Sequence, residues 1–402
     1  MQYGYFDDKN REYVITRPDI PVSWTNYLGC EKTGTVISHN AGGYMFHESA
    51  ENHRVTRFRA NGVPLDRPGH YVYLRDNDSN DYWSISWQPV GKSLDKAKYE
   101  VRHGLSYSIF KCSYKGIKAE QKLFIPLGDA VELWDIKVKN TTKKDKNISL
   151  FPYCEFSFNL IEIDNQNLQM SLYSQGSRYE SGVIEIDNFY DPDMYHYITT
   201  SFDADGFDSV RDQFIGVYNT ETNPQGVIDN EMHNSVELGG NHCGAFKKVI
   251  TLSPGEEKRF IVMLGVGSLE EGKRIKEKYS KHFCSLVWII GADAFLNLDT
   301  WHDWKELFNY CHFAVAMRPN YDLALTKMST ELGQQWCHRL THLQDFKTGK
   351  IKETSGKIIP FTMTQLDISA TNIRERLKNN LSIRYLTPES VYIYINNNGL
   401  YK

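Results

Sequence analysis

The sequence lacks the features that define several protein classes. No uninterrupted apolar run approaches the roughly 20 residues of a membrane-spanning helix, and Met1–Asn10 do not form the basic and then apolar pattern of an export signal. The seven cysteines are scattered, odd in number and free of any C-x-x-C pair, which favours a reducing compartment over a disulfide framework. With a net charge of −4, the chain offers no basic excess to a polyanion. We therefore expect a cytoplasmic protein with no membrane and no nucleic-acid partner.

Two local patterns that invite a functional interpretation are weak. Cysteine and histidine are adjacent in Cys311-His312 and Cys337-His338, but paired zinc ligands are usually separated by about two to four residues. Glu162 and Asp164 alternate along an expected strand and would share one face, which is typical of a solvated strand. We predict no metal site and assign no catalytic role to these carboxylates.

Aromatic side chains are abundant, at 13% of the chain with 25 Tyr and 20 Phe, which favours strands and sugar-facing surfaces. From Met1 to about Gly267 the sequence consists of short runs of alternating polarity, such as Glu12–Thr16 and Trp134–Lys139. Turn residues separate the runs, for example Lys115-Gly116 and Ser253–Glu256. So many strands in one stretch predict a large antiparallel β-sandwich.

The pattern changes at about Ser268, where helix-favouring and strand-favouring segments begin to alternate. The expected elements are a helix over Leu269–Lys281, a strand over Leu286–Ile290 that ends in Gly291, a helix over Trp304–Tyr310, and strands over His312–Met317 and Ile358–Met363. The polar stretch before Lys357 has no assignable pattern. We therefore predict a fold of class β then α/β, with a β-sandwich over 1–268, a connecting helix over 269–284 and a partial doubly wound α/β nucleotide-binding unit over 285–402.

The end of the chain predicts a further helix. Thr387 can cap it and Pro388 can occupy its first position. Val391 and Ile395 fall four residues apart on one apolar face, and Gly399 can end the helix.

A candidate phosphate site lies before the helical run that starts near Thr371. Such a helix would aim its unpaired N–H groups at an anion. Ser369 and Thr371 would add hydroxyl donors, and Arg374 would add a guanidinium one turn later. An ordinary helix cap with a surface arginine accounts for the same residues.

Five segments of the tail resemble the C-terminal half of bacterial nicotinate-nucleotide adenylyltransferase, over about 285–402. They are Gly291-Ala292-Asp293, Thr300–Trp304, Arg318–Tyr321, Ile368–Arg374 and Asn398–Tyr401. The resemblance implies that Gly291 belongs to the nucleotide site and Asp293 contacts the nucleotide ribose, and that Ser369, Thr371 and Arg374 hold ATP phosphates. It also implies that Trp301 stacks on the nicotinate ring beside the His302 backbone, although a core or interface aromatic is the alternative for Trp301. ATP with Mg would be the cofactor if the tail binds nucleotide.

The tail departs from that family where its chemistry resides. The first half of the family carries a G-x-F-D-P-like segment and an H-x-G-H-type pair whose histidines stabilise the reacting phosphates. None of the thirteen histidines here forms such a pair, and Gly4–Asp8 resembles the first segment only superficially. Because nucleotidyl transfer depends on positioned charge at the transition state, we assign no catalytic residue.

The front of the chain, from Met1 to about Ser280, resembles the inverting disaccharide phosphorylases of the cellobiose and chitobiose type. The segments that carry this resemblance are Tyr3–Asp8, Val36–Tyr44, Trp83–Pro89, Tyr99–Leu105 and Asn241–Gly244. In that family this portion is a β super-sandwich that packs against a helical barrel and helps to form a dimer. The barrel supplies the general acid and the phosphate ligands, and this sequence has no counterpart of it.

The resemblance also makes Asn40, Gly42, Gly43 and Tyr44 a carbohydrate-proximal loop, with Tyr44 as a stacking face. A glycine turn with a packing tyrosine is the alternative.

Three functional hypotheses follow. The first is a composite chain with a foldable phosphorylase sandwich, a partial nucleotide-binding tail and no complete activity. The second is an active nicotinate mononucleotide adenylyltransferase that uses ATP. The third is a phosphorylase fragment that acts as a carbohydrate-binding or dimerising module, with disaccharides as small-molecule partners.

Overall fold

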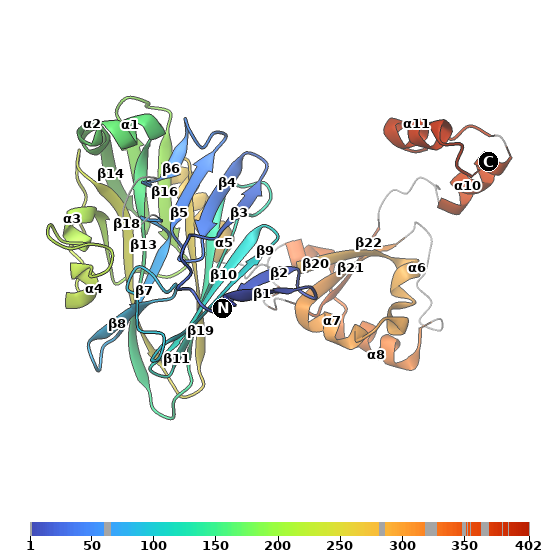
Figure 1. Cartoon of the computed structure of the whole chain (residues 1–402). Helices are drawn as coiled ribbons and strands as arrows, with labels where there is room; N and C mark the ends of the chain where they lie inside the picture. The colour runs from blue at the N-terminus through green and yellow to red at the C-terminus, as the bar shows by residue number, and fades with distance from the viewer. Residues whose placement is uncertain are drawn as a thin grey trace. The chain divides into compact units, whose positions relative to one another are not determined.

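The structure is a computed structural model, and it forms two compact units, Met1–Lys281 and His282–Lys402 (Figure 1). The residues that it describes are 2–59, 66–280, 286–317, 328–347, 351, 353, 355–362, 370–379, 381–384 and 386–401. Among these residues, no helix combines the length and the apolar composition that a bilayer crossing requires.

The first unit is built on two large antiparallel sheets. In spatial order, the ten-stranded sheet consists of β1 (Gly4–Asp7), β2 (Glu12–Ile15), β9 (Lys98–Gly104), β10 (Tyr107–Tyr114), β11 (Ile117–Phe124), β12 (Val131–Asn140), β19 (Glu257–Val266), β16 (Tyr195–Thr200), β15 (Val183–Asn188) and β14 (Gln175–Glu180). The nine-stranded sheet runs through β17 (Gly206–Val210), β18 (His242–Leu252), β13 (Lys146–Asn159), β6 (Arg54–Thr56), β5 (Gly43–His47), β4 (Thr33–Ser38) and β3 (Thr25–Cys30), with β7 (Tyr71–Asp76) and β8 (Asp81–Ser84) branching from β13. The predicted antiparallel sandwich is confirmed.

The alternation of side chains along each strand explains why the two sheets pack together. On β12, Trp134, Ile136 and Val138 are fully buried, whereas Lys139 is exposed. Asp135 departs from the pattern because it is buried in a bidentate pair with Arg259, at 2.5 and 2.7 Å. The inward residues of both sheets form one continuous hydrophobic core.

Two predicted turns have the backbone that tight hairpins require. Lys115 and Gly116, between β10 and β11, have φ values of 47° and 79°. Gly255, between β18 and β19, has a φ of 78°. Positive φ at both central residues suits a hairpin because the turn then matches the twist of its strands.

Short helices interrupt the strand pattern of the first unit: α1 (Ile161–Gln166), α2 (Leu168–Tyr173), α3 (Arg211–Phe214) and α4 (Gln225–Asp229). The strand expected through Glu162 and Asp164 is therefore wrong. Asp164 is buried and accepts a hydrogen bond from Arg57 Nε at 3.3 Å, so it does not lie on a solvated face. The alternation of Glu162 and Asp164 therefore does not indicate a strand, and the burial of Asp164 depends on a residue far away in the chain.

Helix α5 (Leu269–Ser280) packs on the sandwich through the buried Ile275 and Tyr279, and the carboxylate of Asp129 gathers several of its polar contacts. Asp129 accepts hydrogen bonds from Arg274 at 2.8 Å, from Tyr279 at 2.6 Å and from Lys278. Burial alone would raise the pKa of Asp129, but these donors outweigh it and lower the pKa to about 2. The helix predicted over Leu269–Lys281 therefore belongs to the first unit.

The second unit contains a parallel sheet in the order β20 (Leu286–Gly291), β21 (Cys311–Met317) and β22 (Ile358–Thr362). Its helices are α6 (Ala292–Phe295), α7 (Trp304–Tyr310), α8 (Thr330–Arg339), α9 (Leu343–Lys347), α10 (Ala370–Lys378) and α11 (Glu389–Asn397), with a 3₁₀ turn over Leu298–Thr300. Helices α8 and α9 occupy the stretch for which the sequence has no assignable pattern. The observed elements confirm the predicted α/β class.

Strand β20 is incompletely covered. It pairs with β21 on one side and is the first strand of the sheet on the other. Leu286 and Ile289 keep 61% and 69% of their surface exposed, whereas Phe313 on the central β21 is fully buried. Because parallel sheets normally bury both faces, β20 has the environment of a strand without its neighbours.

The C-terminal helix forms, but its predicted cap is wrong. Pro388 occupies the N-cap position, no side chain caps the helix, and the Thr387 hydroxyl is buried without a hydrogen-bond partner among the described residues. The backbone of Thr387 instead pairs with Arg384 in a tight turn. Ile395 is buried whereas Val391 is 43% exposed, and Gly399 has the left-handed φ of 59° expected after a helix end.

Three histidines gather in the sandwich. Nε2 of His196 lies 3.4 Å from Nε2 of His53, and their rings stack 5.5 Å apart. The His47 ring meets the His53 ring edge-on at 5.4 Å. Burial, together with His53 and His47, lowers the pKa of His196 to about 3. The folded chain thus keeps this imidazole neutral where an unfolded chain would protonate it.

We predict that acid weakens the sandwich through His196. Its folded pKa lies below the ordinary value of about 6.5, so the unfolded chain binds more protons between those values. Stability is therefore fully present above about pH 6.5 and falls as the pH falls, by about 1.4 kcal/mol per pH unit. In urea titrations at pH 7 and pH 5, His196→Phe should lose about 2 kcal/mol less than the wild type. Exposed His302→Phe is the control, and an equal loss in all three proteins would contradict the assignment.

We also predict unequal protection of the two units from hydrogen exchange. Amides of β20 should exchange faster than amides of β12 and β19, because β20 has one paired side and exposed apolar side chains. Mass spectrometry of exchanged peptides from the full chain measures this difference. Equal protection of Leu286–Gly291 and Val131–Asn140 would refute it.

Candidate functional sites

The loop that joins β4 to β5 is held by Asp66. The side chains of Ser38 and Asn40 donate hydrogen bonds to Asp66 Oδ2 at 2.9 and 3.2 Å. The Ser38 hydroxyl in turn accepts bonds from the backbone N–H groups of Asn40 and Gly42, both at 3.2 Å. Asn40 is 8% exposed, so its side chain stabilises the loop from inside.

Close backbone approach explains the two glycines of this loop. A Cβ on Gly42 would lie 1.6 Å from the carbonyl oxygen of Asp66. Gly43 has a φ of 142° and lies against the Val36 backbone, where a Cβ would be 2.0 Å from the carbonyl oxygen. Both positions therefore require glycine for packing, whatever further role the loop has.

Tyr44 is half-buried, and one face of its ring is occupied. The Arg54 guanidinium carbon lies 3.8 Å from the ring centroid, a cation–π contact. Phe58 lies 5.5 Å away between ring centroids. A sugar that stacks on Tyr44 would have to use the opposite face.

A buried ionic network lies elsewhere in the nine-stranded sheet, and sequence reasoning missed it. Arg57 is 1% exposed and lies 3.3 Å from Asp164 and 3.7 Å from Glu155. Glu155 also accepts from Arg211 at 2.9 Å and from Tyr153 at 2.7 Å. These partners lie far apart in the chain, so no local spacing could have revealed them.

The tail residues Gly291 and Asp293 lie where β20 ends. Gly291 closes the strand and Asp293 falls in the first turn of α6, with its side chain exposed. A Cβ on Gly291 would meet no atom within 4 Å, so the surroundings described here do not require glycine.

Trp301 and His302 follow the 3₁₀ turn. Trp301 is 37% exposed, and its ring lies 5.5 Å from the ring of Trp288 on β20. The His302 side chain is 96% exposed and lies 3.1 Å from Asp303. Trp301 therefore has a free surface for stacking and also an aromatic neighbour.

The expected phosphate ligands are only partly described. Ser369 lies outside the described residues, as does the Arg318–Tyr321 motif. Thr371 is placed in α10 by its backbone, and Arg374 is exposed on the same helix. Apolar residues of α10 and α11 form a small cluster of their own, distinct from the cluster that β20–β22 share with α6–α8.

Comparison with known families identifies the front of the chain. Residues 11–282 match the family described as glycosyl hydrolase 94, supersandwich domain. The chain belongs to this family. Among glycosyl hydrolase 94 relatives, the N,N'-diacetylchitobiose phosphorylase of Vibrio proteolyticus is 56% identical over 282 residues, which are 69% of this chain and 35% of the relative. The solabiose phosphorylase of Paenibacillus borealis is 25% identical over 287 residues, 68% of this chain and 36% of the relative.

The remainder of this glycosyl hydrolase 94 chain has a second relationship. Residues 242–376 match a family described as cytidylyltransferase-like. The probable nicotinate-nucleotide adenylyltransferase of Dechloromonas aromatica is 43% identical over 118 residues, 29% of this chain and 53% of the relative. Both predicted resemblances are thus confirmed, and the chain is a chimera.

The two family matches overlap over 242–282, and the structure assigns that stretch. Strands β18 and β19 pair with β13 and β12 in the antiparallel sheets, so they belong to the supersandwich. The chain spans about a third of the length of its phosphorylase relatives and about half that of the adenylyltransferase.

The close approach at Gly42 supports a stability prediction. Gly42→Ala should lower the free energy of unfolding of the supersandwich by about 1–3 kcal/mol, because the new methyl group forces the loop away from Asp66. Gly29→Ala is the matched control, since its Cβ would meet the nearest atom at an ordinary 3.4 Å. Denaturant titration compares the two variants. A loss at Gly42 no larger than at Gly29 would contradict the steric argument.

Proposed function

We propose that this chain is a phosphorylase supersandwich that binds carbohydrate without turning it over, joined to a nucleotidyltransferase part that has no complete activity. Its partners are disaccharides for the front and nucleotides for the tail, with ATP and Mg if the tail binds them. The Asn40–Tyr44 loop is the proposed carbohydrate-proximal element. We also propose a cytoplasmic location, a homodimer formed through the sandwich, and a change of family within 269–284.

The state of the carboxyl groups carries this proposal. Inverting phosphorolysis needs an acid that is protonated near neutral pH, which requires a raised pKa. Among the described residues, every carboxyl group with a resolved shift has its pKa lowered. Glu155 is the clearest case: burial would raise its pKa, but Arg211 and Arg57 outweigh burial and hold it ionised. None of these nine carboxyl groups has the raised pKa that a general acid needs.

The exposed β20 supports the second half of the proposal. Nucleotidyl transfer depends on charges held rigidly at the transition state. The strand that ends in Gly291 exposes Leu286 and Ile289 and is an edge strand among the described residues. Few contacts therefore fix the position of side chains at its end.

We predict no turnover in two assays on the full chain. N,N'-diacetylchitobiose or cellobiose with phosphate should release no sugar phosphate, and nicotinate mononucleotide with ATP and Mg should release no pyrophosphate. Clear product from either mixture would refute the proposal.

The alternatives are distinguished by further measurements. If pyrophosphate is released and Arg374→Ala abolishes it, the chain is a nicotinate mononucleotide adenylyltransferase. Calorimetry with disaccharides tests the carbohydrate-binding module. Sedimentation tests the homodimer. If calorimetry detects no heat of binding and sedimentation detects only monomer, the supersandwich neither binds carbohydrate nor forms the dimer.

A further inference from the structure

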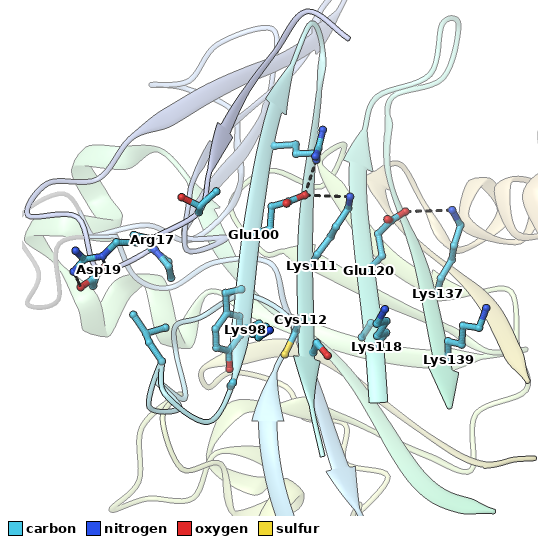
Figure 2. Close-up of a pocket in the computed structure, with 18 of the residues that line it drawn as sticks. Arg17, Asp19, Lys98, Glu100, Lys111, Cys112, Lys118, Glu120, Lys137 and Lys139 are labelled. Atoms are coloured by element: carbon cyan, nitrogen blue, oxygen red, sulfur yellow. Dashed lines mark hydrogen bonds and ion pairs between the residues drawn. The ribbon is translucent and has the colours of Figure 1, made fainter. Parts of the chain in front are cut away.

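A groove of about 1060 Å³ lies on the outward face of the ten-stranded sheet, over β9, β10, β11 and β12 (Figure 2). The segment Thr16–Asp19 borders it on one side. Its size is that of a small-molecule site rather than of a flat protein surface. Two of its charged residues, Glu100 and Arg102, belong to the Tyr99–Leu105 segment of the phosphorylase resemblance, whereas its lysines lie outside the segments that carry that resemblance.

The first row of side chains across this groove is electrically balanced. Glu100, Lys111, Glu120 and Lys137 face one another in register on the four successive strands. Lys111 lies 3.2 Å from Glu100, and Lys137 lies 3.2 Å from Glu120. Each cation in this row is thus paired with a carboxylate, as Figure 2 shows.

The next row, two residues along each strand, is not balanced. In register it contains Lys98, Ser113, Lys118 and Lys139, followed by Glu257 on β19. Among the residues that the structure describes, none forms a hydrogen bond or an ion pair with the side chains of Lys98, Lys118 and Lys139. Lys139 and Glu257 are likewise not joined by an ion pair. Figure 2 shows the three ammonium-bearing side chains along one edge of the groove.

The register of this row places like charges opposite each other, which lowers the stability of the sheet unless a counter-ion binds. Lys118 and Lys139 are direct cross-strand partners, and like charges in that position destabilise a sheet. Seven cationic and four acidic residues line the groove, and one of the cations, Arg102, is also paired with Asp7 and Glu12 beside it, whereas the whole chain has a net charge of −4. The local field therefore favours an anion at this place on an otherwise acidic molecule.

We propose that this groove binds a small molecule through a phosphate group placed between Lys118 and Lys139. Their two ammonium groups offer charge-assisted hydrogen bonds, the Ser113 hydroxyl adds a donor on the neighbouring strand, and Lys98 adds a third cation. The open space toward Thr16–Asp19 accommodates the remainder of a phosphate ester. This site does not depend on the proposed function of either unit.

Titration of the full chain at low ionic strength tests the site. Inorganic phosphate should raise the melting temperature more than sodium chloride of equal ionic strength. In calorimetry, Lys118→Gln/Lys139→Gln should weaken phosphate binding at least about tenfold, because two charge-assisted bonds are lost. Lys9→Gln/Lys143→Gln removes the same charge outside the groove lining and should bind as the wild type does.

A second readout separates binding from general destabilisation. Without phosphate, Lys118→Gln/Lys139→Gln should melt at a higher temperature than the wild type, because the cross-strand repulsion is gone. Tighter binding of glucose 6-phosphate than of phosphate would identify an ester as the ligand, and equal binding would identify the free ion. Stabilisation that merely follows ionic strength, or binding of polyglutamate without binding of phosphate, would overturn the proposal.

Discussion

The packing of the ten-stranded sheet against the nine-stranded sheet determines most of the remaining structure. It buries the inward residues of both sheets in one core, and every polar group carried inside must then find a partner or lose its charge. Arg57 and Glu155 meet this demand by pairing with each other and with Asp164 and Arg211. His196 meets it by remaining neutral. The acid sensitivity that we predict through His196 and the ion pairing of Glu155 thus have one physical origin, the burial of these side chains.

On the outer face of the ten-stranded sheet, helix α5 packs over Val131, Leu133 and Met263, whereas the part over β9–β12 that lines the groove faces water and carries its charges in rows. One row neutralises itself, and the row with Lys98, Lys118 and Lys139 does not. The parallel sheet of the second unit presents the contrast. Its central strand is buried, whereas β20 is an edge strand among the described residues and exposes Leu286 and Ile289. The antiparallel sheets of the first unit bury their inward faces, as such sheets normally do, whereas the parallel sheet of the second unit leaves part of β20 exposed.

Sequence reasoning succeeded where a local signal sufficed. The alternation in Trp134–Lys139, the turn at Lys115-Gly116 and the apolar run before Gly291 each correspond to an observed element. It failed where a distant partner decided the outcome. Asp164 lies in helix α1 and pairs with the distant Arg57, and Pro388 rather than Thr387 occupies the N-cap position of α11. Helix α8 was missed although local signals were present, since Ser329 caps it and the buried Leu332 and Trp336 fall four residues apart.

The sequence by itself determined the two-part character of the chain, its family relationships and the change from strands to alternating helices and strands, since motifs and periodicity are properties of neighbouring residues. Only the tertiary structure decided that β18, β19 and α5 belong to the supersandwich unit, which face of Tyr44 is covered, and which lysines stand opposite one another. Those facts depend on strand register and on contacts between residues far apart in the chain. Local sequence patterns hold no record of them, because pairing is chosen by the free energy of the whole sandwich.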